Sequence, residues 1–173
     1  MATSAELLVD GFERIRENVT DVLDGLTPEQ LAYQVAPGAN PVSWLVWHLT
    51  RVQDDHVAAA FGVPQVWSAA GWAARFGLPA AMTDHGYGHT LEQVAAVAAA
   101  TASADLLTEY HEQTYAQSVK LVSEVTDDDL DWVVDTRWTP HVTLGVRLVS
   151  VLDDDMQHAG QAAYVRGLLL HQG

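Results

Sequence analysis

Four long stretches of this sequence can each form an amphipathic helix, and no segment has the pattern of a long β-strand. In the first stretch, Leu8, Phe12, Ile15, Val19 and Val22 recur at the period of 3.6 residues that places them on one helix face. The four stretches are residues 4–24, 41–61, 103–125 and 143–171. Because such helices must bury their apolar faces against one another, the sequence predicts an all-α four-helix bundle.

Helix-start signals and breakers organise the rest of the chain. In LTPEQL, Thr27, Pro28 and Gln30 form a capping-box start for a short helix. Pro140 excludes helix from the aromatic and β-branched segment 131–142, which we expect to be extended. Between the second and third long helices we expect a short helix around 67–75, a long loop GLPAAMTDHGYGHT (77–90) and a helical piece 91–100. With so long a loop, a simple up-down-up-down order is not assured.

Composition narrows the function classes. The chain has 173 residues, which we expect to form one domain over 1–173, and a net charge of −15. So acidic a surface repels nucleic acid and anionic lipid, and we expect neither as a partner. The absence of cysteine excludes disulfides, thiolate metal sites and a cysteine nucleophile. The N-terminus lacks the pattern of a signal peptide and no apolar run is long enough to span a bilayer, so we expect a cytoplasmic protein.

Carboxylates and an imidazole interrupt the last long helix at VLDDDMQHAGQ (151–161). Asp154 and His158 are four residues apart, which places them on one helix face about 6 Å apart. Their row of the helix is mostly apolar, so both side chains are expected to point inward. Asp153 and Asp155 are turned about 100° to either side, where at least one can reach water. The alternative is that all three aspartates form a solvated patch.

A metal site on Asp154 and His158 needs a third ligand from another helix, because catalytic zinc takes three protein ligands. His48 is the best candidate, since Trp44, Leu45 and Val52 surround it on its helix. A lone inward histidine is more often a hydrogen-bonded core residue. Facing an aspartate–histidine pair inside a bundle, however, it becomes a ligand candidate. A metal-free bundle in which His48 and Asp154 pair in the core remains open.

The other histidines give weaker signals. His56 either contacts the metal ligands without binding the metal or is simply exposed to solvent. His85 and His89 lie in the glycine-rich loop and can reach the mouth of a pocket. His111, in EYHEQTY, resembles an HExxH motif with Tyr115 at the second histidine position, and we expect it at the surface.

Three segments together resemble the DinB/YfiT-like family of metalloenzymes, over nearly the whole chain. They are NPVSWLVWHLTRVQDDH, DHGYGHT and DDDMQHAGQ. The chain is most similar to the branch that contains the metal-binding domain of mycothiol-dependent maleylpyruvate isomerase. The resemblance implies a four-helix bundle of the DinB/YfiT type, a homodimer and a divalent metal on three side chains. That isomerase has a second domain which these 173 residues do not include, so maleylpyruvate isomerisation itself is not implied.

Carried onto this sequence, the resemblance places the metal ligands at His48, Asp154 and His158. The middle ligand is a histidine in many family members and a carboxylate in the isomerase branch. Zinc or nickel is the expected metal, bound at a 1:1 ratio. Helix geometry places Gln161 on the same face as His158, where its amide can hold that ring or a substrate. Of the remaining residues, Trp44 or Trp47 and Tyr87 are expected as apolar walls of the pocket and His89 as a polar contact.

The expected function is a metal-dependent S-transferase or isomerase that uses mycothiol or another low-molecular-weight thiol on a small-molecule substrate. A thiol that coordinates the metal loses its proton and becomes a nucleophile. The same centre could ionise water for hydrolysis. The competing class is a non-catalytic metal-binding or dimeric interaction module. An open coordination position favours the enzyme, whereas four protein ligands favour a structural metal.

Overall fold

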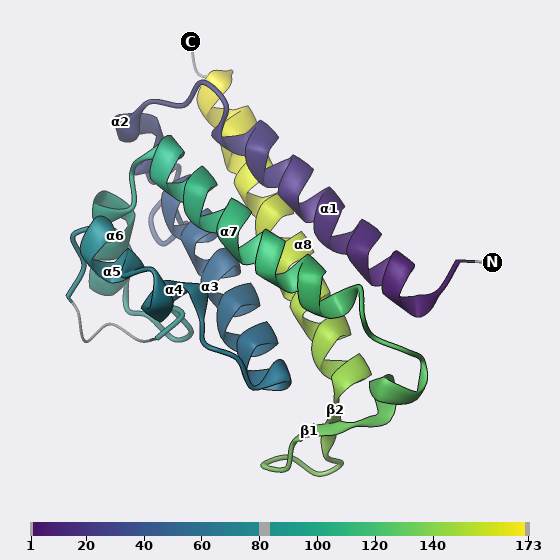
Figure 1. Ribbon diagram of the computed structural model, residues 1–173. Helices are drawn as coiled ribbons and strands as arrows, with labels where there is room; N and C mark the ends of the chain where they lie inside the picture. The colour runs from purple at the N-terminus through teal and green to yellow at the C-terminus, as the bar shows by residue number, and fades with distance from the viewer. Residues whose placement is uncertain (1, 80–83, 172–173) are drawn as a thin grey trace.

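Four long helices form a bundle in the computed structural model, which describes residues 2–79 and 84–171. Helix α1 (Ser4–Leu23) packs against α7 (Ala104–Val122) and α8 (Leu144–Leu170), and α3 (Val42–Phe61) also packs against both α7 and α8. Helices α1 and α8 run in one direction and α3 and α7 in the other (Figure 1). The predicted all-α four-helix bundle is therefore confirmed, with α3 and α8 as antiparallel neighbours.

The predicted capping box starts α2 (Pro28–Leu31) where expected, with Thr27 and Gln30 bonded reciprocally. The helical piece expected at 91–100 is α6 (Leu91–Ala100), and it begins with a capping box of Thr90 and Gln93 that was not predicted. The short helix expected around 67–75 is instead two four-residue helices, α4 (Val66–Ala69) and α5 (Trp72–Arg75). They are separated at Gly71, whose φ of 66° is left-handed and cannot continue a right-handed helix.

The segment before α8 is extended in part, as predicted. After a 3₁₀ turn, η1 (Asp128–Asp131), strand β1 (Val133–Asp135) pairs antiparallel with β2 (Val142–Thr143). Thr143 then accepts a hydrogen bond from the backbone N–H of Val146 and caps α8. This small hairpin lies at one end of the bundle (Figure 1).

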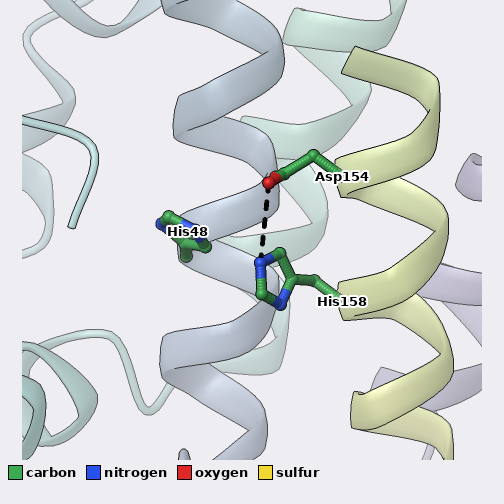
Figure 2. A group of neighbouring side chains, drawn as sticks. All are labelled: His48, Asp154 and His158. Atoms are coloured by element: carbon green, nitrogen blue, oxygen red, sulfur yellow. Dashed lines mark ion pairs between the residues drawn. The ribbon is translucent and has the colours of Figure 1, made fainter. Parts of the chain in front are cut away.

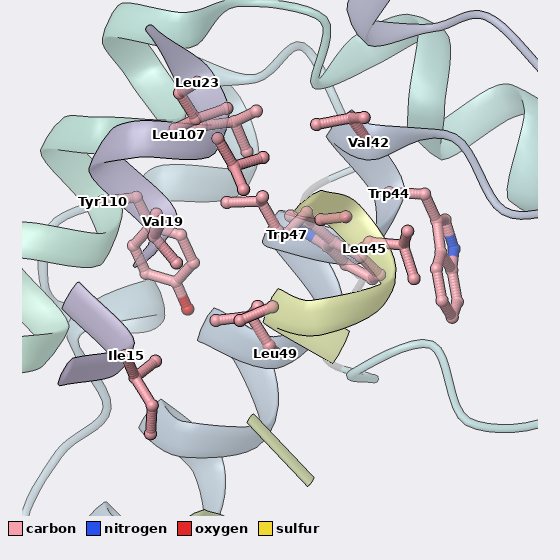
Figure 3. Close-up of a cluster of buried hydrophobic side chains, with 14 of the residues drawn as sticks. Ile15, Val19, Leu23, Val42, Trp44, Leu45, Trp47, Leu49, Leu107 and Tyr110 are labelled. Atoms are coloured by element: carbon pink, nitrogen blue, oxygen red, sulfur yellow. The ribbon is translucent and has the colours of Figure 1, made fainter. Parts of the chain in front are cut away.

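The core is a continuous apolar layer between the four helices (Figure 3). One buried cluster contains Ile15 and Val19 of α1, Leu45 and Leu49 of α3 and Leu107 of α7, and each of them is at most 2% exposed. Burying one such side chain stabilises the fold by about 1.5–3 kcal/mol. The backbone of α3 is thereby fixed, and with it the position of its polar residues.

Among the described residues, no helix is both long and apolar enough to cross a membrane. The expected homodimer and the expected cytoplasmic location stay predictions.

The buried carboxylate of Asp54 connects three segments. Its Oδ1 accepts from the backbone N–H of Val66 at 2.8 Å, and its Oδ2 accepts from the N–H of Trp67 at 2.7 Å and from the Tyr110 hydroxyl at 2.9 Å. Arg51 lies 3.5 Å away, fully buried, with its guanidinium 4.7 Å from the Trp67 ring centroid. Burial raises the pKa of Asp54, while these donors and Arg51 favour its charged form. The carboxylate ties the start of α4 to α3 and α7.

We expect Asp54→Ala to lower the free energy of unfolding by about 3–5 kcal/mol, because the backbone N–H groups of Val66 and Trp67 and the Tyr110 hydroxyl then lose their buried, charged acceptor. Urea denaturation followed by circular dichroism measures the change. The control is Asp153→Ala on the exposed face of α8, which should change stability by no more than about 0.5 kcal/mol. A loss below about 1 kcal/mol for Asp54→Ala would show that the network contributes little.

Candidate metal centre

Helix α3 delivers His48 to its contact with α8, where the side chain is 5% exposed. The Nδ1–H of His48 donates to the backbone carbonyl of His85, and the indole of Trp44 stacks on the imidazole with centroids 4.6 Å apart. Burial lowers the pKa of His48 to about 4, so the ring is neutral at pH 7. Since a carbonyl only accepts, the proton belongs on Nδ1, and Nε2 keeps its lone pair for a ligand.

Helix α8 presents Asp154 and His158 to His48 from the opposite side (Figure 2). Asp154 Oδ1 lies 3.8 Å from His158 Nε2, and the His158 ring centroid lies 4.7 Å from that of His48. His158 Nδ1 lies 2.9 Å from Gln161 Oε1. With the amide oxygen accepting there, His158 also carries its proton on Nδ1 and directs an Nε2 lone pair toward Asp154.

The three side chains fit a divalent cation. One donor atom from each of His48, Asp154 and His158 lies within 4.8 Å of the others. Ligand atoms around tetrahedral zinc, at about 2.0–2.2 Å from the metal, are roughly 3.3–3.6 Å apart, and Asp154 Oδ1 and His158 Nε2 are 3.8 Å apart. Asp154 Oδ2 is buried and has no hydrogen-bond partner among the described residues. A buried carboxylate without a donor is costly, and a cation would satisfy it.

Burial raises the pKa of Asp154, while the neighbouring His158 and His56 oppose that rise. Two imidazoles and one carboxylate make a donor set that suits zinc or nickel.

The three aspartates of α8 have three different environments. Asp153 is exposed, Asp154 is half-buried and Asp155 is completely buried. Neither carboxyl oxygen of Asp155 has a hydrogen-bond partner among the described residues, and burial raises its pKa well above the usual value. The alternative that all three aspartates form a solvated patch is therefore wrong, because only Asp153 is exposed.

The loop that starts at Asp84, directly after the undescribed residues 80–83, lies against His48, since the His85 carbonyl accepts a hydrogen bond from that ring. Gly86 has a φ of 93°, and a Cβ there would lie 2.9 Å from the Trp47 ring and 3.1 Å from His48 Nδ1. Only glycine allows this backbone so close to the site. His89 is held between Trp44, whose Nε1–H lies 3.4 Å from His89 Nδ1, and Asp84.

The three residues expected as apolar walls of the pocket differ in their distance from His48 and in their exposure. Trp44 stacks directly on His48, whereas Trp47 is completely buried and packs 6.0 Å from the His89 ring centroid. Tyr87 is 88% exposed. In this conformation Trp44 and His89 lie beside the centre, Trp47 supports them from below the surface, and Tyr87 leaves its ring in solvent.

The surface position expected for His111 is wrong. His111 is 2% exposed, its Nδ1 lies 3.1 Å from the Thr50 hydroxyl, and burial lowers its pKa to about 4. The signal was present in the sequence, because His111 follows the buried Leu107 by four residues and so shares its helix face. It belongs to neither cluster of metal-ligand type found in the described residues.

Sequence reasoning also missed a second cluster. Asp55 and His56, in the second half of α3, meet His85 of the loop, with one donor atom from each within 4.8 Å of the others. The sequence left two positions for His56, either behind the metal ligands or exposed to solvent. In the structure it is half-buried.

Comparisons with known proteins agree with the sequence resemblance. Residues 7–170 match the family model described as mycothiol S-transferase, so the chain belongs to the mycothiol S-transferase family. A crystal structure of a conserved protein from Enterococcus faecalis is 31% identical, with 98% of this chain and 99% of that chain covered and a TM-score of 0.87. No curated protein matches. The predicted relation to mycothiol-dependent proteins of the DinB/YfiT type is confirmed.

We expect His48→Ala and His158→Ala each to abolish tight binding of one divalent ion per chain, because two remaining donors hold a metal poorly. Elemental analysis after dialysis against metal-free buffer measures retention. His171→Ala, on an exposed histidine at the end of α8, is the control and should retain the metal. Equal retention by all three variants would place the ion elsewhere.

The hydrogen bond from His158 to Gln161 gives a separate prediction. Gln161→Leu should weaken metal affinity by roughly 10–100-fold while the bundle stays folded, because the ring loses the acceptor that orients it. Competition with a chromophoric chelator measures the affinity. The matched control is Gln157→Leu, one turn earlier on α8, whose amide contacts only the exposed Asp153 among the described residues. Unchanged affinity for Gln161→Leu would leave that residue with a packing role alone.

Proposed function

We propose that this member of the mycothiol S-transferase family is a metal-dependent enzyme that joins a low-molecular-weight thiol of the mycothiol type to an electrophilic small molecule. His48, Asp154 and His158 are the proposed ligands of a zinc or nickel ion. The observation that carries the proposal is the convergence of three donor atoms within 4.8 Å, beside a buried Asp154 oxygen that lacks a partner among the described residues.

Three protein ligands support a catalytic rather than a structural ion. A structural zinc is closed by four protein ligands, whereas a catalytic zinc keeps a position for water or substrate. The cluster contains three donors from the described residues. A thiol bound at the open position would be deprotonated by the ion. This property separates the enzyme from a metal-binding interaction module, which needs no open position.

The side chains of the centre have defined tasks in this reaction. His48 and His158 are oriented by the His85 carbonyl and by Gln161, so both imidazoles keep Nε2 available. Asp154 would offset one of the two positive charges of the ion. Trp44 and His89 form the edge along which the body of the thiol would lie, because the centre itself fixes only the sulfur.

The transfer step balances simply. The thiol proton passes to solvent, and the thiolate sulfur forms a bond with the electrophilic carbon. The leaving group departs with the electron pair of the bond that breaks. In an isomerase the same thiolate would add to the substrate and later leave again, but the family match favours transfer.

We expect the zinc-loaded protein to accelerate thioether formation between mycothiol and the fluorogenic electrophile chlorobimane. Chelation of the metal, or His158→Ala, should lower the protein-dependent rate by at least about 100-fold. The reason is that the metal, by stabilising the thiolate, would lower the activation free energy by several kcal/mol. Calorimetric titration of mycothiol into the zinc-loaded protein tests binding separately. A rate that survives chelation would exclude the metal mechanism. Failure of mycothiol to bind would move a hydrolase or a non-catalytic module ahead of the transferase.

A further inference from the structure

We propose that Asp55, His56 and His85 form a second binding site for a divalent transition-metal cation, separate from the centre at His48, Asp154 and His158. The two clusters have the same donor types, two imidazoles and one carboxylate. In each cluster, one donor atom per residue lies within 4.8 Å of the others. Imidazole and carboxylate together select ions such as zinc, cobalt and nickel.

The second cluster is built where the second half of α3 meets the loop. Asp55 and His56 follow His48 by about two helical turns, and His85 comes from the loop that covers His48. The His56 and His85 ring centroids are 5.6 Å apart, and His56 Nδ1 lies 3.6 Å from Asp55 Oδ2. The donors therefore come from two segments about 30 residues apart in the chain.

An independent observation points to a missing partner. His85 Nδ1 is buried and has no hydrogen bond to any described residue. Buried polar atoms in folded proteins are nearly always satisfied, so this ring nitrogen calls for a ligand or an ordered water. Asp55 also has capacity left, because Gln65 Nε2 donates to its Oδ1 at 2.6 Å and leaves Oδ2 turned toward His56.

The charges around the cluster permit a cation but limit its affinity. Arg147 Nη1–H donates to His56 Nδ1 at 3.4 Å, so an ion at this nitrogen would have to replace that hydrogen bond, and the positive charge of Arg147 opposes a metal ion. The same guanidinium is paired through Nη2 with Asp135 Oδ2 at 3.1 Å, but Asp135 also pairs with Arg137, so the charge of Arg147 is only partly balanced. We therefore expect weaker binding than at the first centre.

His85 connects the two sites. Its ring belongs to the second cluster, while its backbone carbonyl accepts the hydrogen bond from His48 Nδ1–H. An ion on the His85 ring would hold this part of the loop in place and so help to orient His48. This coupling, unlike the second site itself, rests on the proposed function of the first centre. By linkage, each ion would then tighten the binding of the other by the same factor.

The test is a cobalt(II) titration of the metal-free full chain, with bound metal measured by equilibrium dialysis and coordination by visible absorption. We expect two equivalents per chain, one tight and one weaker. His56→Gln and Asp55→Asn should each bind one equivalent, with a first-site affinity reduced a few-fold. The control His141→Gln, an exposed histidine on the hairpin loop, should still bind two. Circular dichroism of each variant verifies folding.

Two results would overturn the inference: saturation of the wild type at one equivalent, or two equivalents retained by both His56→Gln and Asp55→Asn. His48→Ala separates this inference from the proposed function. A His48→Ala protein that keeps the weaker, His56-dependent equivalent supports the second site even if mycothiol transfer is never observed. A wild type that binds one ion and transfers mycothiol would reject the second site and leave the proposed function intact.

Discussion

The packing of α3 against α8 is the contact on which the site depends. It places a neutral, buried imidazole from one helix against a half-buried carboxylate and a second half-buried imidazole from the other. Apolar packing on both sides, by residues such as Leu45 and Val151, keeps the two helices together. Asp154 is half-buried and its Oδ2 has no hydrogen-bond partner among the described residues, so a bound cation would supply the partner that this oxygen lacks.

The loop before α6 completes the site from outside the bundle. Its backbone reaches His48 only because Gly86 has no side chain and a positive φ. The His85 carbonyl then fixes the proton of His48 on Nδ1, as Gln161 does for His158. Both imidazoles are thus prepared by hydrogen bonds to present the same nitrogen. Such outer hydrogen bonds usually decide how well a metal site holds its ion.

Local chemistry explains which parts of this structure could be predicted from the sequence. The long helices follow from apolar periodicity, and Thr27 and Thr90 cap α2 and α6 through side-chain bonds that span three residues. The approach of Asp154 to His158 follows from helix geometry, and the approach of His48 follows once the bundle is assumed. The break between α4 and α5 was missed because a single glycine, Gly71, decides it.

Other features depend on contacts between distant segments, which no local pattern reveals. Asp54 reads as a surface charge on α3, yet it is buried because Val66, Trp67 and Tyr110 all donate to it. His85 could be assigned to a pocket mouth, but its pairing with Asp55 and His56 depends on the path of the loop.

X-ray absorption spectroscopy of the protein loaded with one equivalent of zinc tests the metal centre most directly. The account predicts two imidazole ligands and oxygen from Asp154 at about 2.0–2.2 Å, with no sulfur, since the chain has no cysteine. Addition of mycothiol should introduce one sulfur at about 2.3 Å while both imidazoles remain. Fewer than two imidazoles, or no sulfur ligand at saturating mycothiol, would contradict the proposed His48–Asp154–His158 centre and its use in thiol transfer.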